Sequence, residues 1–112
     1  MTMQARANFW IEKNGKVVLS TWRVRLLEAV EETGSISAAA SKMGISYRRA
    51  WEKIHESEDR LGIKLVETQT GGEGGGGSYL TPTATDYIQR FHNFTGGLKG
   101  MVAQRFQESF QE

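Results

Sequence analysis

The stretch GSISAAASKMGISYRRAW, residues 34–51, decides the fold, because it predicts two short helices joined by a tight turn. Ser37 is placed to cap the first helix, which we expect over 37–43, and the alanines that follow favour helix. Gly44 falls where the residue after a helix adopts the left-handed conformation, and Ser46 can cap the second helix. The pattern is typical of a helix-turn-helix, whose second helix enters the major groove of DNA.

The segment before this motif predicts a hairpin and a helix. β-prone runs lie on either side of Asn14-Gly15, a strong type I′ turn signal, so we expect a β-hairpin over residues 8–20. Ser20 or Thr21 can then cap a helix that reaches about Glu32.

The segment after the second motif helix, which we expect over 47–61, predicts a two-stranded ribbon. Short β-prone runs at 64–67 and 78–81 flank a glycine-rich loop. A helix, a helix-turn-helix and a ribbon together make a winged helix-turn-helix. Thr81-Pro82 opens the last helix, with threonine as the N-cap and proline in the first turn, where it is tolerated.

The last helix carries an apolar stripe that a small domain with its own core does not need. Apolar side chains recur three or four residues apart, interrupted at Gly96-Gly97. We expect a homodimer interface through Tyr87, Phe91, Phe94, Leu98, Val102 and Phe106. The chain is thus predicted to be mainly α-helical (α+β), with a winged helix-turn-helix and N-terminal β-hairpin over 1–81 and a long C-terminal dimerisation helix over 82–112.

The basic residues of the motif predict a nucleic-acid surface. The net charge of the 112 residues is only +1, so DNA affinity must come from a local patch. Arg48 and Arg49 lie near the start of the second motif helix, and arginine pairs bidentately with guanine. A solvated helix face is the alternative, and Glu52 is expected to pair with one of the two. The predicted DNA-binding residues are Ser46, Tyr47, Arg48, Arg49, Lys53, Lys42, Lys64, Gly74, Gly75 and Gly76.

The glycine-rich loop allows more than one interpretation. It lacks the GxxxxGK[ST] pattern of a phosphate-binding P-loop. Its composition is that of a flexible linker. Between two predicted strands, however, it fits a wing tip whose backbone approaches DNA closely, as glycine permits.

Composition argues against catalysis and metal binding. The chain has no cysteine, which excludes disulfides, zinc fingers and thiol catalysis. His55 and His92 stand 37 residues apart and are expected at the surface, so we predict no metal site, no cofactor and no enzyme activity. Trp10, Trp22 and Trp51 are predicted to be core or interface residues. We see no signal peptide or membrane span and expect a cytoplasmic protein.

Residues 34–51 and 65–84 (LVETQTGGEGGGGSYLTPTA) resemble the DNA-binding domain of the molybdate-responsive ModE-type transcriptional regulators, relatives of the LysR-type winged helix-turn-helix. The wing motif TGGEGGGG is the most specific part. The resemblance implies a homodimer that binds double-stranded DNA, with molybdenum-related genes as candidate targets. Full family members carry C-terminal molybdate-binding domains, whereas this sequence ends at Glu112. DNA binding therefore carries over, and molybdate sensing does not; no other effector is indicated.

Two other functions remain as alternatives. The small net charge and apolar last helix would suit a protein-interaction module that uses the fold without binding DNA. The second alternative is a sensor that binds an oxyanion directly on the glycine-rich loop, since backbone N–H groups can hold anions. The loop carries Glu73 and no cation, which argues against it.

Overall fold

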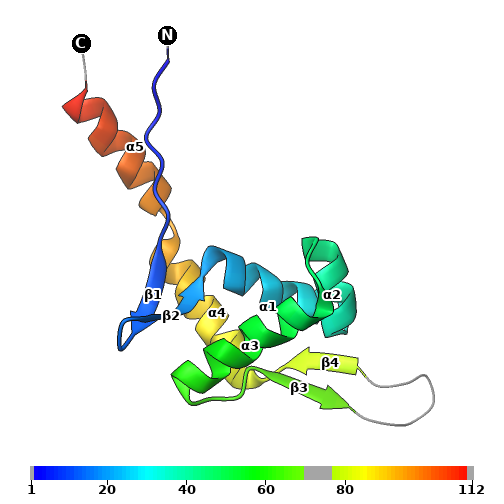
Figure 1. Ribbon diagram of the computed structural model, residues 1–112. Helices are drawn as coiled ribbons and strands as arrows, with labels where there is room; N and C mark the ends of the chain where they lie inside the picture. Colours follow the sequence, from blue (N-terminus) through cyan, green and yellow to red (C-terminus); the bar gives the residue numbers. More distant parts are fainter. Residues whose placement is uncertain (1, 70–76, 111–112) are drawn as a thin grey trace.

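The computed structural model describes residues 2–69 and 77–110 (Figure 1). In chain order these residues form β1 (Trp10–Lys13), β2 (Lys16–Ser20), α1 (Thr21–Thr33), α2 (Ile36–Met43), α3 (Tyr47–Leu61), β3 (Val66–Gln69), β4 (Gly77–Leu80), α4 (Pro82–Thr95) and α5 (Leu98–Ser109). Strands β1 and β2 form one antiparallel hairpin, and β3 and β4 form another. The predicted winged helix-turn-helix with an N-terminal hairpin is therefore confirmed.

Local signals in the sequence set the first elements as expected. Asn14 and Gly15 have φ angles of 54° and 77°, the left-handed values that a type I′ turn requires. The hydroxyl of Ser20 accepts a hydrogen bond from the amide of Arg23 at 3.1 Å, which caps α1. Gly34, with φ at 79°, ends that helix.

The helix-turn-helix differs from the prediction at one cap. Ser35, not Ser37, caps α2, because its hydroxyl accepts from the amide of Ala38 at 2.9 Å. Gly34 turns the chain out of α1, which leaves Ser35 extended and lets the helix begin one residue earlier, at Ile36. The caps predicted at Gly44 and Ser46 are confirmed, with φ of 70° at the glycine.

The core lies where α1, α2 and α3 meet the wing and α4. Alanines at contact points of the motif allow the helices to approach closely, and branched side chains fill the centre. The buried residues of this cluster are Leu19, Val24, Leu26, Leu27, Ala29, Val30, Ile36, Ala39, Ala40, Ala50, Ile54, Leu65, Val66, Ala84, Ile88 and Phe91.

The wing is tied to the turn between α1 and α2. The amide of Ser78 donates to the carbonyl oxygen of Gly34 at 2.8 Å. A Cβ on Gly77 would lie 3.0 Å from that same oxygen, so a larger residue there would have to push the two contacting segments slightly apart. The carboxylate of Glu31 accepts from the amide of Leu80 at 3.1 Å. These bonds hold the base of the wing beside the start of the motif.

The C-terminal segment is not one long helix. Thr81 caps α4 with a 3.0 Å bond from the amide of Ala84, as predicted. The helix then ends at Gly96 and Gly97, and Gly97 has a φ of 82°, so α5 starts in a new direction. The helical conformation cannot pass through a residue in that left-handed region.

Phe91 is buried in the domain core, with 3% of its surface exposed, so its predicted place in a dimer interface is wrong. Ala84 and Ile88 join it there, so α4 completes the core that we expected residues 1–81 to form alone. By contrast, α5 buries none of its described residues. Figure 1 shows α5 and the N-terminal segment projecting together from the domain, and the described residues as a whole, these projections included, measure 64 × 31 × 21 Å.

Candidate nucleic-acid interface

Helix α3 is fixed by one buried face and presents the other to solvent. Ala50, Ile54 and Ser57 are buried at 2% exposure or less, and Glu58 lies beside them. The hydroxyl of Ser46 accepts from the amide of Arg49 at 3.1 Å, so it acts as the cap. This bond satisfies one of the amide groups that would otherwise lack a partner in the first turn of α3.

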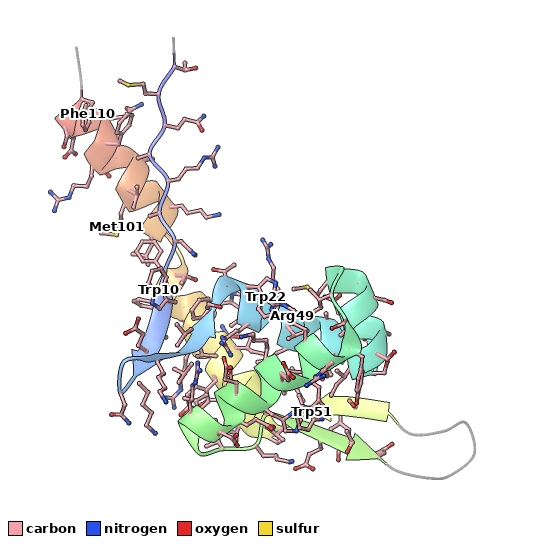
Figure 2. The ribbon with its side chains drawn as sticks, viewed as in Figure 1. Trp10, Trp22, Arg49, Trp51, Met101 and Phe110 are labelled. Atoms are coloured by element: carbon pink, nitrogen blue, oxygen red, sulfur yellow. The ribbon has the colours of Figure 1, made fainter. Side chains whose placement is uncertain are left out.

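The two adjacent arginines do not point the same way. The side chain of Arg48 is 89% exposed and its Nε lies 2.9 Å from a carboxylate oxygen of Glu52, the expected pairing. Arg49 instead reaches toward α1, where its guanidinium carbon lies 5.7 Å from the ring centre of Trp22 (Figure 2). Arg48 therefore lies on the outermost face of the helix, and Arg49 on its flank.

The other residues predicted to bind DNA lie on different parts of the surface. Tyr47 is exposed in the first turn of α3. Lys64 is exposed just before the wing, whereas Lys42 forms an ion pair with Glu32 of α1. Lys53 is only 28% exposed and lies 3.6 Å from Glu56, on the side of α3 that faces α1. The structure thus leaves Tyr47 and Arg48 exposed in the first turn of α3, while Tyr47 and Lys64 line one groove between α3 and the wing.

The predicted wing-tip residues Gly74, Gly75 and Gly76 lie outside the described residues. The paired strands on either side are described, with Gln69 opposite Gly77 at the end of the ribbon. The strands match their predicted places to within two residues. Their position beside α3 is that of a wing.

A buried glutamate, which sequence reasoning missed, joins α3 to the wing. Glu58 is 7% exposed, and its Oε2 accepts from the amides of Leu65 and Val66 at 2.8 and 3.1 Å. Strand β3 begins at Val66 rather than at the predicted Lys64. Its position four residues after the buried Ile54 places Glu58 near the buried face of α3, but the helical spacing does not reveal the two amides that it binds.

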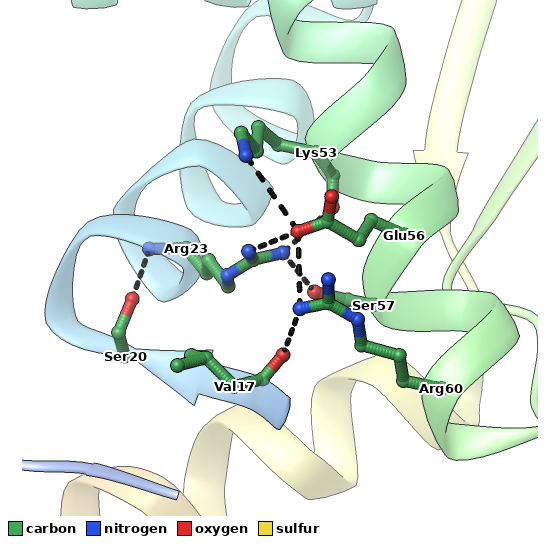
Figure 3. A network of polar contacts seen from close by, with 7 residues as sticks. All are labelled: Val17, Ser20, Arg23, Lys53, Glu56, Ser57 and Arg60. Carbon is green, nitrogen blue, oxygen red and sulfur yellow. Dashed lines mark hydrogen bonds and ion pairs between the residues drawn. The ribbon is translucent and has the colours of Figure 1, made fainter. Parts of the chain in front are cut away.

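A polar network, also missed, joins α3 to α1 (Figure 3). Arg23 is 11% exposed and donates to the Lys53 carbonyl oxygen, the Ser57 hydroxyl and the Glu56 carboxylate. The Arg23 hydrogen bond holds the pKa of Glu56 below its ordinary value, with further help from the charges of Arg23, Lys53 and Arg60. This network fixes α3 against α1 while leaving the outer face of α3 free.

Two classes of site are missing from the described part of the chain. No group of three or more histidine, cysteine or acidic side chains within residues 2–69 and 77–110 could hold a metal ion. None of the helices described there has the length and apolar character needed to cross a membrane.

Comparison with known families supports the architecture. Residues 22–85 match the model of the bacterial regulatory helix-turn-helix proteins of the lysR family. The matched range runs from the start of α1 to the start of α4. It contains the helix-turn-helix and the wing.

Two curated relatives are similar over the same region. The chain is 46% identical over 63 residues to the molybdenum transport protein ModE of Herbaspirillum seropedicae, covering 56% of this chain and 23% of that protein. It is 38% identical over 89 residues to the DNA-binding transcriptional dual regulator ModE of Escherichia coli (strain K12), covering 80% of this chain and 34% of that protein. The chain thus spans about a quarter to a third of the length of these relatives.

A solved structure shows the same fold. The chain is similar to the protein of the BenM_DBD/benA site 1 DNA complex, with a TM-score of 0.60 and 23% identity. The similarity covers 84% of this chain and 100% of that one. At this level of identity the likeness establishes the fold.

Proposed function

Because the chain belongs to the lysR family of bacterial regulatory helix-turn-helix proteins, we propose that it is a sequence-specific double-stranded DNA-binding transcriptional regulator. The observation that carries the proposal is Arg48, held 89% exposed on the outer face of a capped helix beside the wing. A guanidinium there can donate two hydrogen bonds to guanine in the major groove. Lys64 and the wing would add phosphate contacts, which are sequence-independent.

We propose that the protein acts as a homodimer through its C-terminal part. Helix α5 has 12 residues and none of them is buried, and isolated helices of that length are marginal in water. An apolar groove runs along it, lined by Phe9, Leu98, Met101, Val102, Phe106 and Phe110, among others. A second copy would cover this groove, and a two-fold dimer would place two α3 helices on half-sites one or more helical turns apart.

The relatives named for molybdenum transport suggest the genes involved. We propose molybdenum-related genes as targets, and a cytoplasmic location, where the chromosome lies. We propose no catalytic role, since the relatives are named as regulators.

The DNA-binding proposal is tested with an Arg48→Ala variant. Duplexes retained by the wild-type protein from a random library give a specific site, and the variant should bind that site about 10- to 100-fold more weakly. Its melting temperature should stay within a degree or two, because the side chain is exposed. Arg90→Ala is the matched control, since Arg90 is also an exposed arginine, with Nε 2.9 Å from Asp86 on α4.

Salt dependence separates DNA binding from the alternative of a protein-interaction module. Phosphate contacts release counterions, so wild-type affinity for duplex DNA should fall steeply with added salt. A protein that retains no duplex at low salt, or an Arg48→Ala variant that binds like the wild type, would contradict the proposed interface.

The homodimer is tested with Phe106→Glu. Phe106 is half-buried along the groove and stacks on Phe110 with ring centres 5.1 Å apart, so a carboxylate there would oppose burial by a second copy. Sedimentation equilibrium should show a wild-type dimer and a monomeric variant with unchanged melting of the domain. Gln107→Glu, at an exposed neighbouring position, adds the same charge and should remain dimeric. A wild-type monomer at tens of micromolar would rule out the dimer.

A further inference from the structure

A row of aromatic side chains lines a groove between α3 and the wing. Tyr47, Trp51 and His55 follow one another at one-turn intervals along one side of the helix. The groove has a volume of about 300 Å³, and its other walls come from the wing strands and from the N-terminal end of α2. Lys64 also lines it. Figure 2 shows Trp51 on the side of α3 that faces the strands.

Trp51 is both exposed and rigid. Its indole ring stacks on the imidazole of His55, with ring centres 3.8 Å apart and planes 20° apart. Nδ1 of His55 lies 2.9 Å from the Trp51 carbonyl oxygen, which fixes the imidazole in turn. Even so, 43% of Trp51 is exposed, and 54% of Tyr47. A ring already held in place loses little conformational entropy when it binds, so this surface is prepared for a partner.

The neighbours of the aromatic row indicate what that partner offers. Arg48 directly follows Tyr47 and lies three residues, about one helical turn, before Trp51, so the exposed arginine and the two rings lie close together along α3. The only apolar group at a base edge in the major groove is the C5-methyl of thymine. Indole and phenol rings bury such a methyl without leaving a polar group unsatisfied.

We propose that Trp51, with Tyr47 beside it, recognises thymine methyl groups in the DNA site. The inference rests on the proposed function, and adds an apolar determinant of base choice to the polar one at Arg48. It makes thymine, next to a guanine read by Arg48, the expected feature of each half-site. Trp51 then specifies sequence, whereas a merely structural Trp51 would affect all duplexes equally.

The experiment removes the methyl group and nothing else. Thymines in the duplex selected by the wild-type protein are replaced one at a time by deoxyuridine, which keeps every hydrogen-bonding group. Wild-type affinity should fall about three- to five-fold at one or more positions, as expected for losing one buried methyl. Trp51→Ala should bind the thymine and deoxyuridine duplexes at those positions equally well, and Trp51→Phe should retain part of the difference.

Trp10→Ala is the matched control. Trp10 is 50% exposed but lies on β1, away from α3, so the variant should keep the full sensitivity to deoxyuridine. Circular dichroism melting of each variant separates loss of recognition from loss of the fold.

The possible results test the thymine assignment separately from DNA binding itself. If the wild-type protein retains duplex but deoxyuridine has no effect at any position, the thymine assignment is overturned and DNA binding stands. The assignment is also overturned if Trp51→Ala remains sensitive to deoxyuridine, because the ring would then contact sugar, phosphate or a protein partner. Retention of no duplex at all overturns the proposed function itself.

Discussion

Replacing Phe91 with alanine is expected to lower the free energy of unfolding by about 3–5 kcal/mol, the usual cost of emptying a buried phenylalanine site. Phe91 is 3% exposed and belongs to the same buried cluster as Val24 and Leu27 of α1. The cavity would lie where α4 meets α1, and α1 also supports α3. Chemical denaturation followed by circular dichroism measures the change, and a small domain can lose its folded state altogether at this cost.

Phe94→Ala provides the control for that result. It lies one turn further along α4 and is 51% exposed, so its loss should change the unfolding free energy by less than about 0.5 kcal/mol. Both residues were expected at the dimer interface from sequence, and the pair of variants separates the two roles. If the two variants were equally stable, Phe91 would have to be a surface residue, which would contradict the core described here.

Elements whose signals are local could be predicted from the sequence. The type I′ turn at Asn14-Gly15, the glycine after α2 and the caps at Ser46 and Thr81 each depend on a few neighbouring residues. Backbone chemistry of this kind requires no knowledge of distant contacts. The bounds of α3 were therefore predicted correctly, and with them the position of Arg48 in its first turn.

Features that depend on distant contacts could not be predicted in the same way. The stripe on α4 has the same helical spacing whether it faces the domain's own core or a second copy, so Phe91 and Phe94 looked alike. Glu58 resembled a solvated acid until the amides of Leu65 and Val66 were placed beside it. Burial of a charge depends on partners that the helix period does not reveal.

The sequence pattern also failed to predict the exposure of two tryptophans. A large aromatic residue is usually buried, so Trp10 and Trp51 were expected in the core or an interface, yet both are about half exposed. For Trp51 the exposure follows from geometry, because its side of α3 faces the groove rather than α1. The sequence pattern does not reveal this placement. Because the ring lies exposed in the groove, its proposed role in base choice can be tested by substitution.

The network at Arg23 gives the second large effect. Arg23→Ala should lower the free energy of unfolding by about 1–3 kcal/mol, because the buried Ser57 hydroxyl loses its donor and the Glu56 carboxylate keeps only Lys53 and Arg60 as partners. Since these bonds fix α3 against α1, specific DNA binding should weaken as well. Arg25→Ala, an exposed arginine on the same helix, should be close to wild type in stability.

The stability difference between wild type and Arg23→Ala should depend on pH in a defined direction. Arg23 lowers the pKa of Glu56 in the folded protein, so the unfolded chain binds that proton more readily. The resulting stabilisation is fully present above the ordinary glutamate pKa of about 4.3 and is lost as pH falls through the lowered value. Denaturation of both proteins from pH 7 to pH 3 should therefore show a gap that is widest near neutrality and narrows on acidification. A gap that stays constant over this range would mean that Arg23 acts through Ser57 and the Lys53 carbonyl alone, and that Glu56 contributes nothing to holding α3 against α1.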